Sequence, residues 1–140
     1  VTSAAVLGAA LTRVGRYDDA ERVFAALAAF TPETPYDQRT ASTFLRNWGD
    51  LALHQGRPRV AAERCERALA IAAELVAEGN PIRNAAESCA GLAAAANGDA
   101  ERARALLAPN AERLRAAGPQ GRWMLARVEA ALAALPPGGR

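Results

Sequence analysis

Apolar residues recur along this chain at intervals of three and four positions, a spacing that places them on one side of an α-helix. The pattern predicts amphipathic helices over about residues 18–30, 37–55 and 59–78. The longest apolar stripe lies in the third of these segments and consists of Ala61, Cys65, Ala68, Leu69, Ala72, Leu75 and Val76. We therefore expect helices that each bury one face.

Four more helices complete the pattern. One precedes Gly15, and another covers about residues 82–96, with Asn80 as its N-cap and Pro81 in its first turn. A further helix starts near Ala100, and Pro109 is expected to kink or split it because proline removes a helical hydrogen bond. The last helix covers about residues 120–135 and carries Leu125, Val128, Leu132 and Leu135 on one side.

Three segments of the chain share one pattern. They are LGAALTRVGRYDDAERVFAAL (7–27), WGDLALHQGRPRVAAERCERAL (48–69) and AGLAAAANGDAERARALLAPN (90–110). Two series of glycines align among them, namely Gly8, Gly49 and Gly91, and Gly15, Gly56 and Gly98. The period is 41 residues and then 42, and each unit is expected to be a hairpin of two antiparallel helices.

The two glycines of each unit have different predicted roles. The second glycine lies where a first helix ends and suits a left-handed C-cap. After it, Asp18 and Asp99 are expected to be N-caps, and Pro58 suits a first helical turn. The first glycine lies inside a helix, where it costs about 1 kcal/mol relative to alanine. Close approach of the partner helix is expected to offset that cost.

The pattern therefore predicts an all-α domain of three hairpins and a terminal helix over residues 1–135, followed by a disordered tail at 136–140. In a stacked array the end units must cover their open faces. The terminal helix suits such a capping role. No capping segment precedes the first hairpin, so self-association through the N-terminal hairpin, or contact with an upstream segment, is expected there.

The repeated residues resemble the tetratricopeptide repeat (TPR) family over about residues 1–117. The first unit matches that family's pattern at Leu7, Gly8, Leu11, Ala20, Phe24, Leu27 and Pro32. The later units match it at Trp48, Gly49, Ala61, Cys65 and Ala68, and at Ala90, Gly91, Ala103 and Leu107. The period exceeds the usual 34 residues. This longer style is similar to repeats in the sensor regions of large bacterial transcription regulators. The resemblance implies a TPR-like α-solenoid.

The resemblance also implies a concave groove lined by the first helix of each hairpin. Its candidate residues include Ala5, Ala9, Thr12, Thr43, Leu53, Ala85, Leu92 and Ala95. The candidates with polar side chains, proposed to bind a partner, are Arg13, Arg46, Asn47, Asp50, His54 and Ser88. Arg46, Asp50 and His54 follow one another at intervals of four and share one helix face. Arg46 is expected to bind a peptide carboxylate, although an ordinary ion-paired helix face explains the same spacing.

Composition narrows the class of partner. All 17 basic residues are arginine, and the formal net charge is only +2. Arginine alternates with glutamate, as in AAERCERAL, whereas a nucleic-acid surface needs a basic stripe, so we expect no direct nucleic-acid binding. No apolar run approaches the roughly 20 residues of a membrane span, and no signal peptide is visible. These features predict a cytoplasmic protein without a membrane partner.

Candidate chemistry is sparse. Cys65 and Cys89 lie on apolar stripes and are expected to be buried thiols, with a disulfide or a redox pair as open alternatives. His54 is the single histidine, so no metal site and no cofactor are expected. The sequence has no phosphate-binding glycine loop and no nucleophile elbow, so we expect no enzyme. The resulting prediction is a module that binds a protein or peptide; the alternative is an effector-sensing domain for a small molecule.

Overall fold

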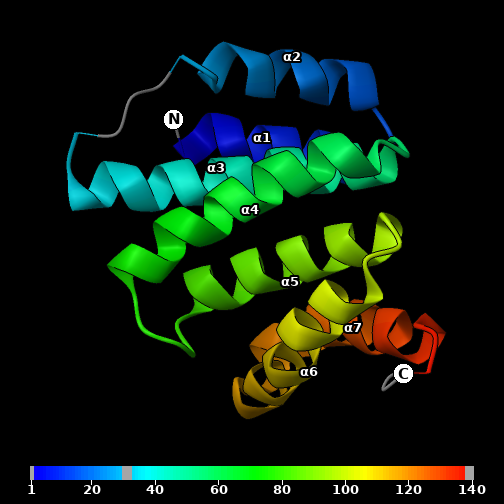
Figure 1. Ribbon diagram of the computed structural model, residues 1–140. Helices are drawn as coiled ribbons and strands as arrows, with labels where there is room; N and C mark the ends of the chain where they lie inside the picture. Colours follow the sequence, from blue (N-terminus) through cyan, green and yellow to red (C-terminus); the bar gives the residue numbers. More distant parts are fainter. Residues whose placement is uncertain (1, 30–32, 138–140) are drawn as a thin grey trace.

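The computed structural model describes residues 2–29 and 33–137 of the chain. These residues form seven α-helices and one short 3₁₀ helix, with no strand among them (Figure 1). In chain order the helices are α1 (Thr2–Arg13), α2 (Tyr17–Leu27), α3 (Pro35–His54), α4 (Pro58–Leu75), α5 (Pro81–Ala96), α6 (Ala100–Ala116), η1 (Gly118–Gly121) and α7 (Arg122–Ala134). The prediction of an all-helical chain is therefore confirmed.

Neighbouring helices pack in two rows. The odd-numbered helices α1, α3, α5 and α7 contact one another in that order. The helices α2, α4 and α6 each contact the odd-numbered helix before and the one after them (Figure 1). Consequently α5 has α3, α4, α6 and α7 around it, and most of its surface is covered. This position of α5 decides which of its polar side chains solvent can reach.

Turn and cap residues explain most helix boundaries. Gly15, Gly56 and Gly98 have φ angles of 82°, 70° and 79°, the left-handed conformation expected after a helix end. Pro58 and Pro81 begin α4 and α5 as predicted. The side-chain oxygens of the N-caps accept backbone hydrogen bonds, Asn80 from Ile82 N at 2.9 Å and Asp99 from Arg102 N at 3.1 Å.

Several predicted boundaries were wrong. Asp18 is not an N-cap, because Arg16 occupies that position and Asp18 lies in the first turn of α2. A carboxylate there still interacts favourably with the helix dipole.

Helix α4 ends at Leu75 rather than at residue 78, since Val76 is extended at φ −137° and ψ 154°. Helix α7 starts at Arg122 because 118–121 form the 3₁₀ turn. Residues 30 and 138–140 lie outside the described residues.

The glycines inside helices do mark close helix contacts. A Cβ atom built on Gly8 would lie 2.5 Å from the ring of Phe24. At the equivalent positions, a Cβ on Gly49 would lie 2.5 Å from Cys65 Sγ, and one on Gly91 would lie 2.4 Å from Leu107. Each glycine thus admits a side chain of the second helix of its own hairpin. This confirms the close approach that the repeated sequence predicts.

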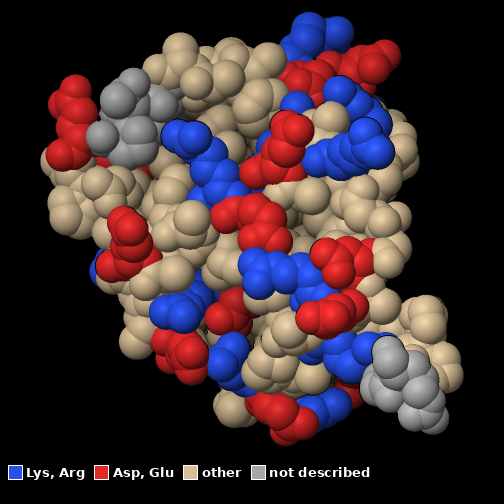
Figure 2. Space-filling model, in the orientation of Figure 1, with Lys and Arg blue, Asp and Glu red and all other residues tan. Residues whose placement is uncertain are grey.

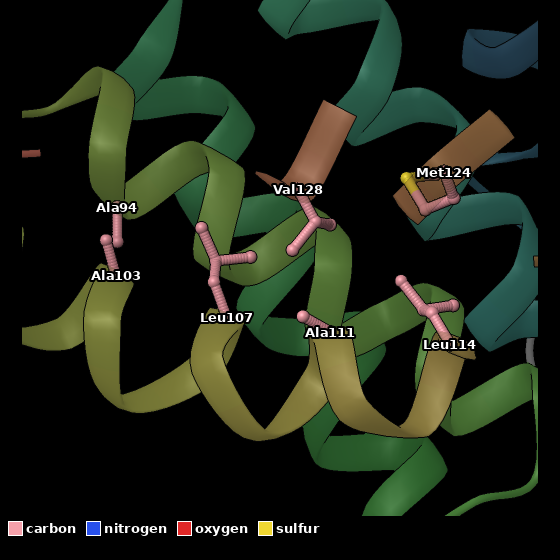
Figure 3. Close-up of a cluster of buried hydrophobic side chains, with 7 residues drawn as sticks. All are labelled: Ala94, Ala103, Leu107, Ala111, Leu114, Met124 and Val128. Carbon is pink, nitrogen blue, oxygen red and sulfur yellow. The ribbon is translucent and has the colours of Figure 1, made fainter. Parts of the chain in front are cut away.

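Helix α6 continues through Pro109 from Ala100 to Ala116, so the predicted split was wrong. Pro109 lies on the exposed side of the helix, as does Ala105, whose carbonyl loses its helical partner to the proline. The opposite side of α6 is anchored in the core. Figure 3 shows its side chains Leu107, Ala111 and Leu114 directed toward Val128 and Met124 of α7.

The two cysteines form a disulfide, so the expectation of buried thiols was wrong. Cys65 of α4 and Cys89 of α5 are 0% and 3% exposed, and their Cα atoms lie 5.3 Å apart. That separation is common for disulfides. The missing side chain of Gly49 leaves room for both sulfurs, because a Cβ there would lie 2.5 Å from one and 3.1 Å from the other. The bond links the second helical hairpin to the third.

A candidate binding groove between α1, α3 and α7

The candidate groove is a cavity of about 430 Å³ on the side of α3 that faces α1 and α7. It contains five of the six residues predicted to bind a partner. Its lining consists of Val6, Ala9 and Arg13 from α1, Thr43, Arg46, Asn47, Asp50 and His54 from α3, and Trp123 and Arg127 from α7. The groove is therefore built from segments more than a hundred residues apart in the chain.

Helix geometry places the α3 residues together. Thr43, Arg46, Asn47, Asp50 and His54 follow the three- and four-residue spacing of one helix face. The apolar side of α3, with Phe44 and Leu51, is buried in the core against α1 and α2. Because that side is buried, the polar face is left toward the cavity.

Two residues of α1 that were expected in the groove are buried instead. Ala5 and Thr12 are 2% and 4% exposed, and the Thr12 hydroxyl donates a hydrogen bond to the carbonyl of Gly8 at 2.8 Å. Neither residue lines the cavity of about 430 Å³. Ala9 and Arg13 do line it, so α1 contributes a narrower face than the sequence suggested.

Ser88 does not belong to the groove. Its side chain is fully buried, and its hydroxyl oxygen lies 2.8 Å from Asn110 Oδ1 and 3.0 Å from the carbonyl oxygen of Asn84, two acceptors that share its single proton. Asn110 in turn donates to the Asn84 carbonyl at 3.0 Å. The prediction failed because α5 is surrounded by four helices, and its polar residues serve a hydrogen-bond network inside the protein.

Arg46 has no ion-pair partner among the described residues, and neither has Arg13, whereas Arg127 is paired with Asp50. No carboxylate of the described residues lies within 4.0 Å of the Arg46 guanidinium, and its buried Nε has no hydrogen-bond partner there. Burial lowers the pKa of Arg46, the nearby Asp50 raises it, and Arg127 lowers it further. Arginine titrates far above neutral pH, so the side chain keeps its charge. A half-buried guanidinium without an ion-pair partner favours binding of an anion.

Asp50 is already paired. Arg127 Nη2 donates to Asp50 Oδ1 at 2.9 Å, and His54 Nε2 lies 3.4 Å from Asp50 Oδ2. This carboxylate therefore neutralises the side chain that α7 brings to the groove. With three arginines and one aspartate along its wall, the groove carries an excess of positive charge.

Several arginines outside the groove pair with carboxylates of a neighbouring helix. In Figure 2, acidic and basic side chains alternate over the visible face. Arg102 of α6 lies 2.8 Å from the carboxylate of Glu66 in α4, and Arg115 of α6 lies 2.8 Å from that of Glu129 in α7. Such exposed pairs are weak contributors to stability.

Sequence reasoning missed Trp123 and Arg127 as groove residues. It assigned the terminal helix a capping role only, and the stripe from Leu125 to Leu135 does face α6. Trp123 lies off that stripe and is 57% exposed, with Arg127 one turn later and 6.0 Å from its ring centre. An aromatic residue and an arginine four positions apart on the polar face were the available signal.

Comparisons with known proteins add no further assignment to this site. No family model, no curated protein and no solved structure matches the chain. Within residues 2–29 and 33–137, no cluster of three His, Cys, Asp or Glu side chains could hold a metal ion. No helix in the described part of the chain is long and apolar enough to cross a membrane. The function is therefore argued from the groove itself.

Proposed function

We propose that this chain is a non-catalytic interaction module that binds an acidic, extended segment of a protein partner in the groove. The observation that carries the proposal is Arg46, a half-buried side chain without a carboxylate partner in the described structure. Arg13 adds positive charge at the groove, and Val6 and Trp123 offer apolar contacts. A carboxylate of the partner would supply the charge-assisted hydrogen bonds that Arg46 lacks.

We further propose a TPR-like array for the three hairpins. The period of 41 and 42 residues supports it, as do the matching glycine contacts at Gly8, Gly49 and Gly91. The order of contacts among α1, α3, α5 and α7 is that of stacked repeats, in which each unit touches only its neighbours. Such arrays present one row of helices to a partner.

The resemblance of the long repeats to those of bacterial transcription regulators supports a module of a cytoplasmic regulator. One structural feature argues against a cytoplasmic location. The Cys65–Cys89 disulfide is typical of an oxidising compartment, whereas cytosolic thiols are kept reduced. The proposed groove does not depend on the compartment.

Peptide binding tests the proposed function. The probe is a fluorescein-labelled peptide in which glutamate alternates with serine, and its control has glutamine in place of glutamate. We expect fluorescence anisotropy to detect tighter binding of the acidic peptide. Arg46→Met should weaken that binding about tenfold or more, since a hydrogen bond to a charged group contributes roughly 1.5–3 kcal/mol.

The matched control is Arg59→Met, which removes an exposed arginine of α4 outside the groove. It should leave the affinity within about twofold, because distant surface charges are screened at physiological salt. Equal binding of the two peptides, or equal effects of the two substitutions, would contradict an acidic ligand in this groove.

Asp50→Asn tests the charge balance of the groove in the opposite direction. The substitution removes the groove's carboxylate and frees Arg127 from its 2.9 Å pair. We expect the acidic peptide to bind several-fold more tightly, with the gain largest at low salt where the charge is least screened. Weaker binding would mean that Asp50 itself orients the ligand, and the argument from net positive charge would then be wrong.

A further inference from the structure

A second cavity of about 210 Å³ adjoins the groove, because Arg46 and Trp123 line both. Its remaining wall comes from the first turns of α5, the end of α6, the 3₁₀ turn η1 and Met124 of α7. We call this space the adjoining cavity, and it opens to solvent about as widely as the groove does. Sites for drug-sized ligands have roughly 300–1,000 Å³. The adjoining cavity therefore suits one side chain of a larger partner.

The adjoining cavity is apolar where the groove is charged. Among the described residues that line it, only Arg46 has a charged side chain, whereas Arg13, Asp50 and Arg127 line the groove alone.

Part of the apolar wall belongs to the core. Leu114 and Met124 are 5% and 7% exposed, and Figure 3 shows them directed toward one another at the end of the core between α6 and α7. Because core packing holds these two side chains, this part of the wall is formed before any partner binds.

The terminal helix builds this cavity, and the repeated segments do not. The wall residues Ala117, Gly121, Trp123 and Met124 all follow the third repeated segment, which ends at residue 110. Trp123 is 57% exposed, so a large aromatic surface is uncovered where the two cavities meet. Aromatic residues are enriched in protein interfaces. Helix α7 thus adds a contact surface next to the cation of the groove.

We propose that the adjoining cavity binds one large apolar side chain, such as leucine, of the same acidic segment that the groove binds. This inference rests on the proposed function and adds the sequence class of the partner. An acidic side chain pairs with Arg46, and the apolar side chain packs against Leu114, Trp123 and Met124. An extended chain advances about 3.3 Å per residue, so two side chains in neighbouring cavities lie within about three residues of one another.

The position of Arg46 decides between an acidic and a neutral occupant. Arg46 lies on the border of both cavities and has no carboxylate partner among the described residues. A purely apolar segment would cover this guanidinium without pairing it, and covering an unpaired charge is unfavourable. An apolar residue flanked by acidic ones covers the cavity and pairs the cation together.

The first test compares fluorescein-labelled peptides of equal charge. One peptide alternates glutamate with serine, and the second has leucine in place of the central serine, so that glutamates lie one and three residues from the leucine. We expect the leucine peptide to bind about five- to tenfold more tightly by fluorescence anisotropy, because burial of its side chain removes apolar surface from water. A third peptide, with leucine kept and glutamine in place of glutamate, should lose that affinity.

Met124 reports whether the leucine enters the cavity. It is the single methionine of the chain, so labelling of methionine methyl groups gives one NMR signal. Met124 lines the adjoining cavity and not the groove. Saturating leucine peptide should shift this signal, and saturating serine peptide should leave it nearly unchanged.

Two neighbouring alanines provide a cavity-filling variant and its matched control. Ala117 is exposed and lines the adjoining cavity, whereas Ala116 is exposed and lines neither cavity. Ala117→Phe should remove the advantage of the leucine peptide and leave the serine peptide bound as before. Ala116→Phe should preserve the advantage, and circular dichroism should show the same helix content in both variants.

Several results would overturn the inference. They are equal affinity of the leucine and serine peptides, no Met124 shift with bound leucine peptide, equal effects of the two phenylalanine variants, and equal binding of the glutamine peptide. A Met124 signal that moves with protein concentration alone would instead assign the cavity to a second copy of the chain.

The results separate this inference from the proposed function. Binding of the serine peptide that depends on Arg46, without a gain from leucine, refutes the adjoining cavity alone. Failure of both acidic peptides refutes the acidic ligand of the groove, and the inference that rests on it fails with it.

Discussion

Glycine takes the place of a larger side chain at one equivalent position in α1, α3 and α5. In each case a residue of the following helix occupies the space where a Cβ would lie. The occupants differ in kind, since they are Phe24, Cys65 and Leu107. The three hairpins thus share the geometry of this contact, while the residue that fills the space differs from one hairpin to the next.

Gly49→Ala is expected to destabilise the protein. A Cβ there would meet Cys65 Sγ at 2.5 Å and the backbone nitrogen of Cys65 at 3.3 Å, and neither atom belongs to a flexible chain end. Overpacking of this kind costs about 1–3 kcal/mol, against a helix-propensity gain of about 1 kcal/mol. Chemical denaturation should show a lower free energy of unfolding.

The control for this prediction is Ala70→Gly at an exposed position of α4. This substitution measures the difference in helix propensity between alanine and glycine by itself, and it should lower the free energy of unfolding by about 1 kcal/mol. If Gly49→Ala were instead more stable than the unmodified chain, the close contact at Gly49 would be refuted.

Residue spacing also located most of the groove. Arg46, Asp50 and His54 are one turn apart on α3, and the structure brings all three to the same cavity with Arg13 and Asn47. The placement of Ser88 in the groove was wrong, because the spacing of residues within one helix could not reveal that four other helices surround α5. The pairing of Asp50 with Arg127 was also invisible in the sequence, since it joins residues 77 positions apart.

At the scale of elements, α6 contains an unusual interior proline. Pro109 removes the hydrogen bond that its amide would donate to the carbonyl of Ala105, yet the helix runs from Ala100 to Ala116. Buried contacts of Leu107, Ala111 and Leu114 hold the two halves in line. Packing on one side of a helix can therefore compensate for a missing backbone hydrogen bond on its exposed side.

Pro109→Ala is expected to stabilise the protein. Alanine restores the backbone donor at an exposed position, where interior proline costs about 3 kcal/mol relative to alanine. The unfolded chain has more conformational freedom with alanine than with proline, and this lowers the gain in stability by about 0.4–1 kcal/mol. Calorimetry should record a Tm higher by several degrees. An unchanged or lower Tm would show that α6 needs the proline's geometry to keep its contacts.

At the scale of the whole molecule, the first hairpin leaves apolar side chains uncovered. Val6, Leu7 and Val14 of α1 and its following turn are 60%, 51% and 70% exposed. At the other end, Val128 of α7 is fully buried and Met124 is 7% exposed because α7 packs on α5 and α6. Among the described residues of α7, Trp123, at 57%, is the one large apolar side chain that is exposed. The three exposed aliphatic side chains of the first hairpin support the predicted self-association through the N-terminal hairpin.

Sedimentation equilibrium tests that prediction. We expect the average mass of the chain to rise with concentration above that of the 14.6 kDa monomer. Leu7→Glu with Val14→Glu should hold it at the monomer mass, because charges on an apolar contact are costly to bury. Glu101→Gln, at an exposed position of α6 far along the chain, is the control and should associate normally. A concentration-independent monomer would contradict the prediction.

Local pattern determined the secondary structure of this protein. Apolar spacing, glycine after each first helix and the caps at Asn80 and Asp99 act between residues a few positions apart, so the sequence alone reveals them. The same reasoning predicted the polar face of α3. Only the tertiary structure decided that α7 reaches the groove, that Ser88 is buried and that Cys65 bonds to Cys89. These features depend on which helices become neighbours, and that choice is made by packing of the whole chain.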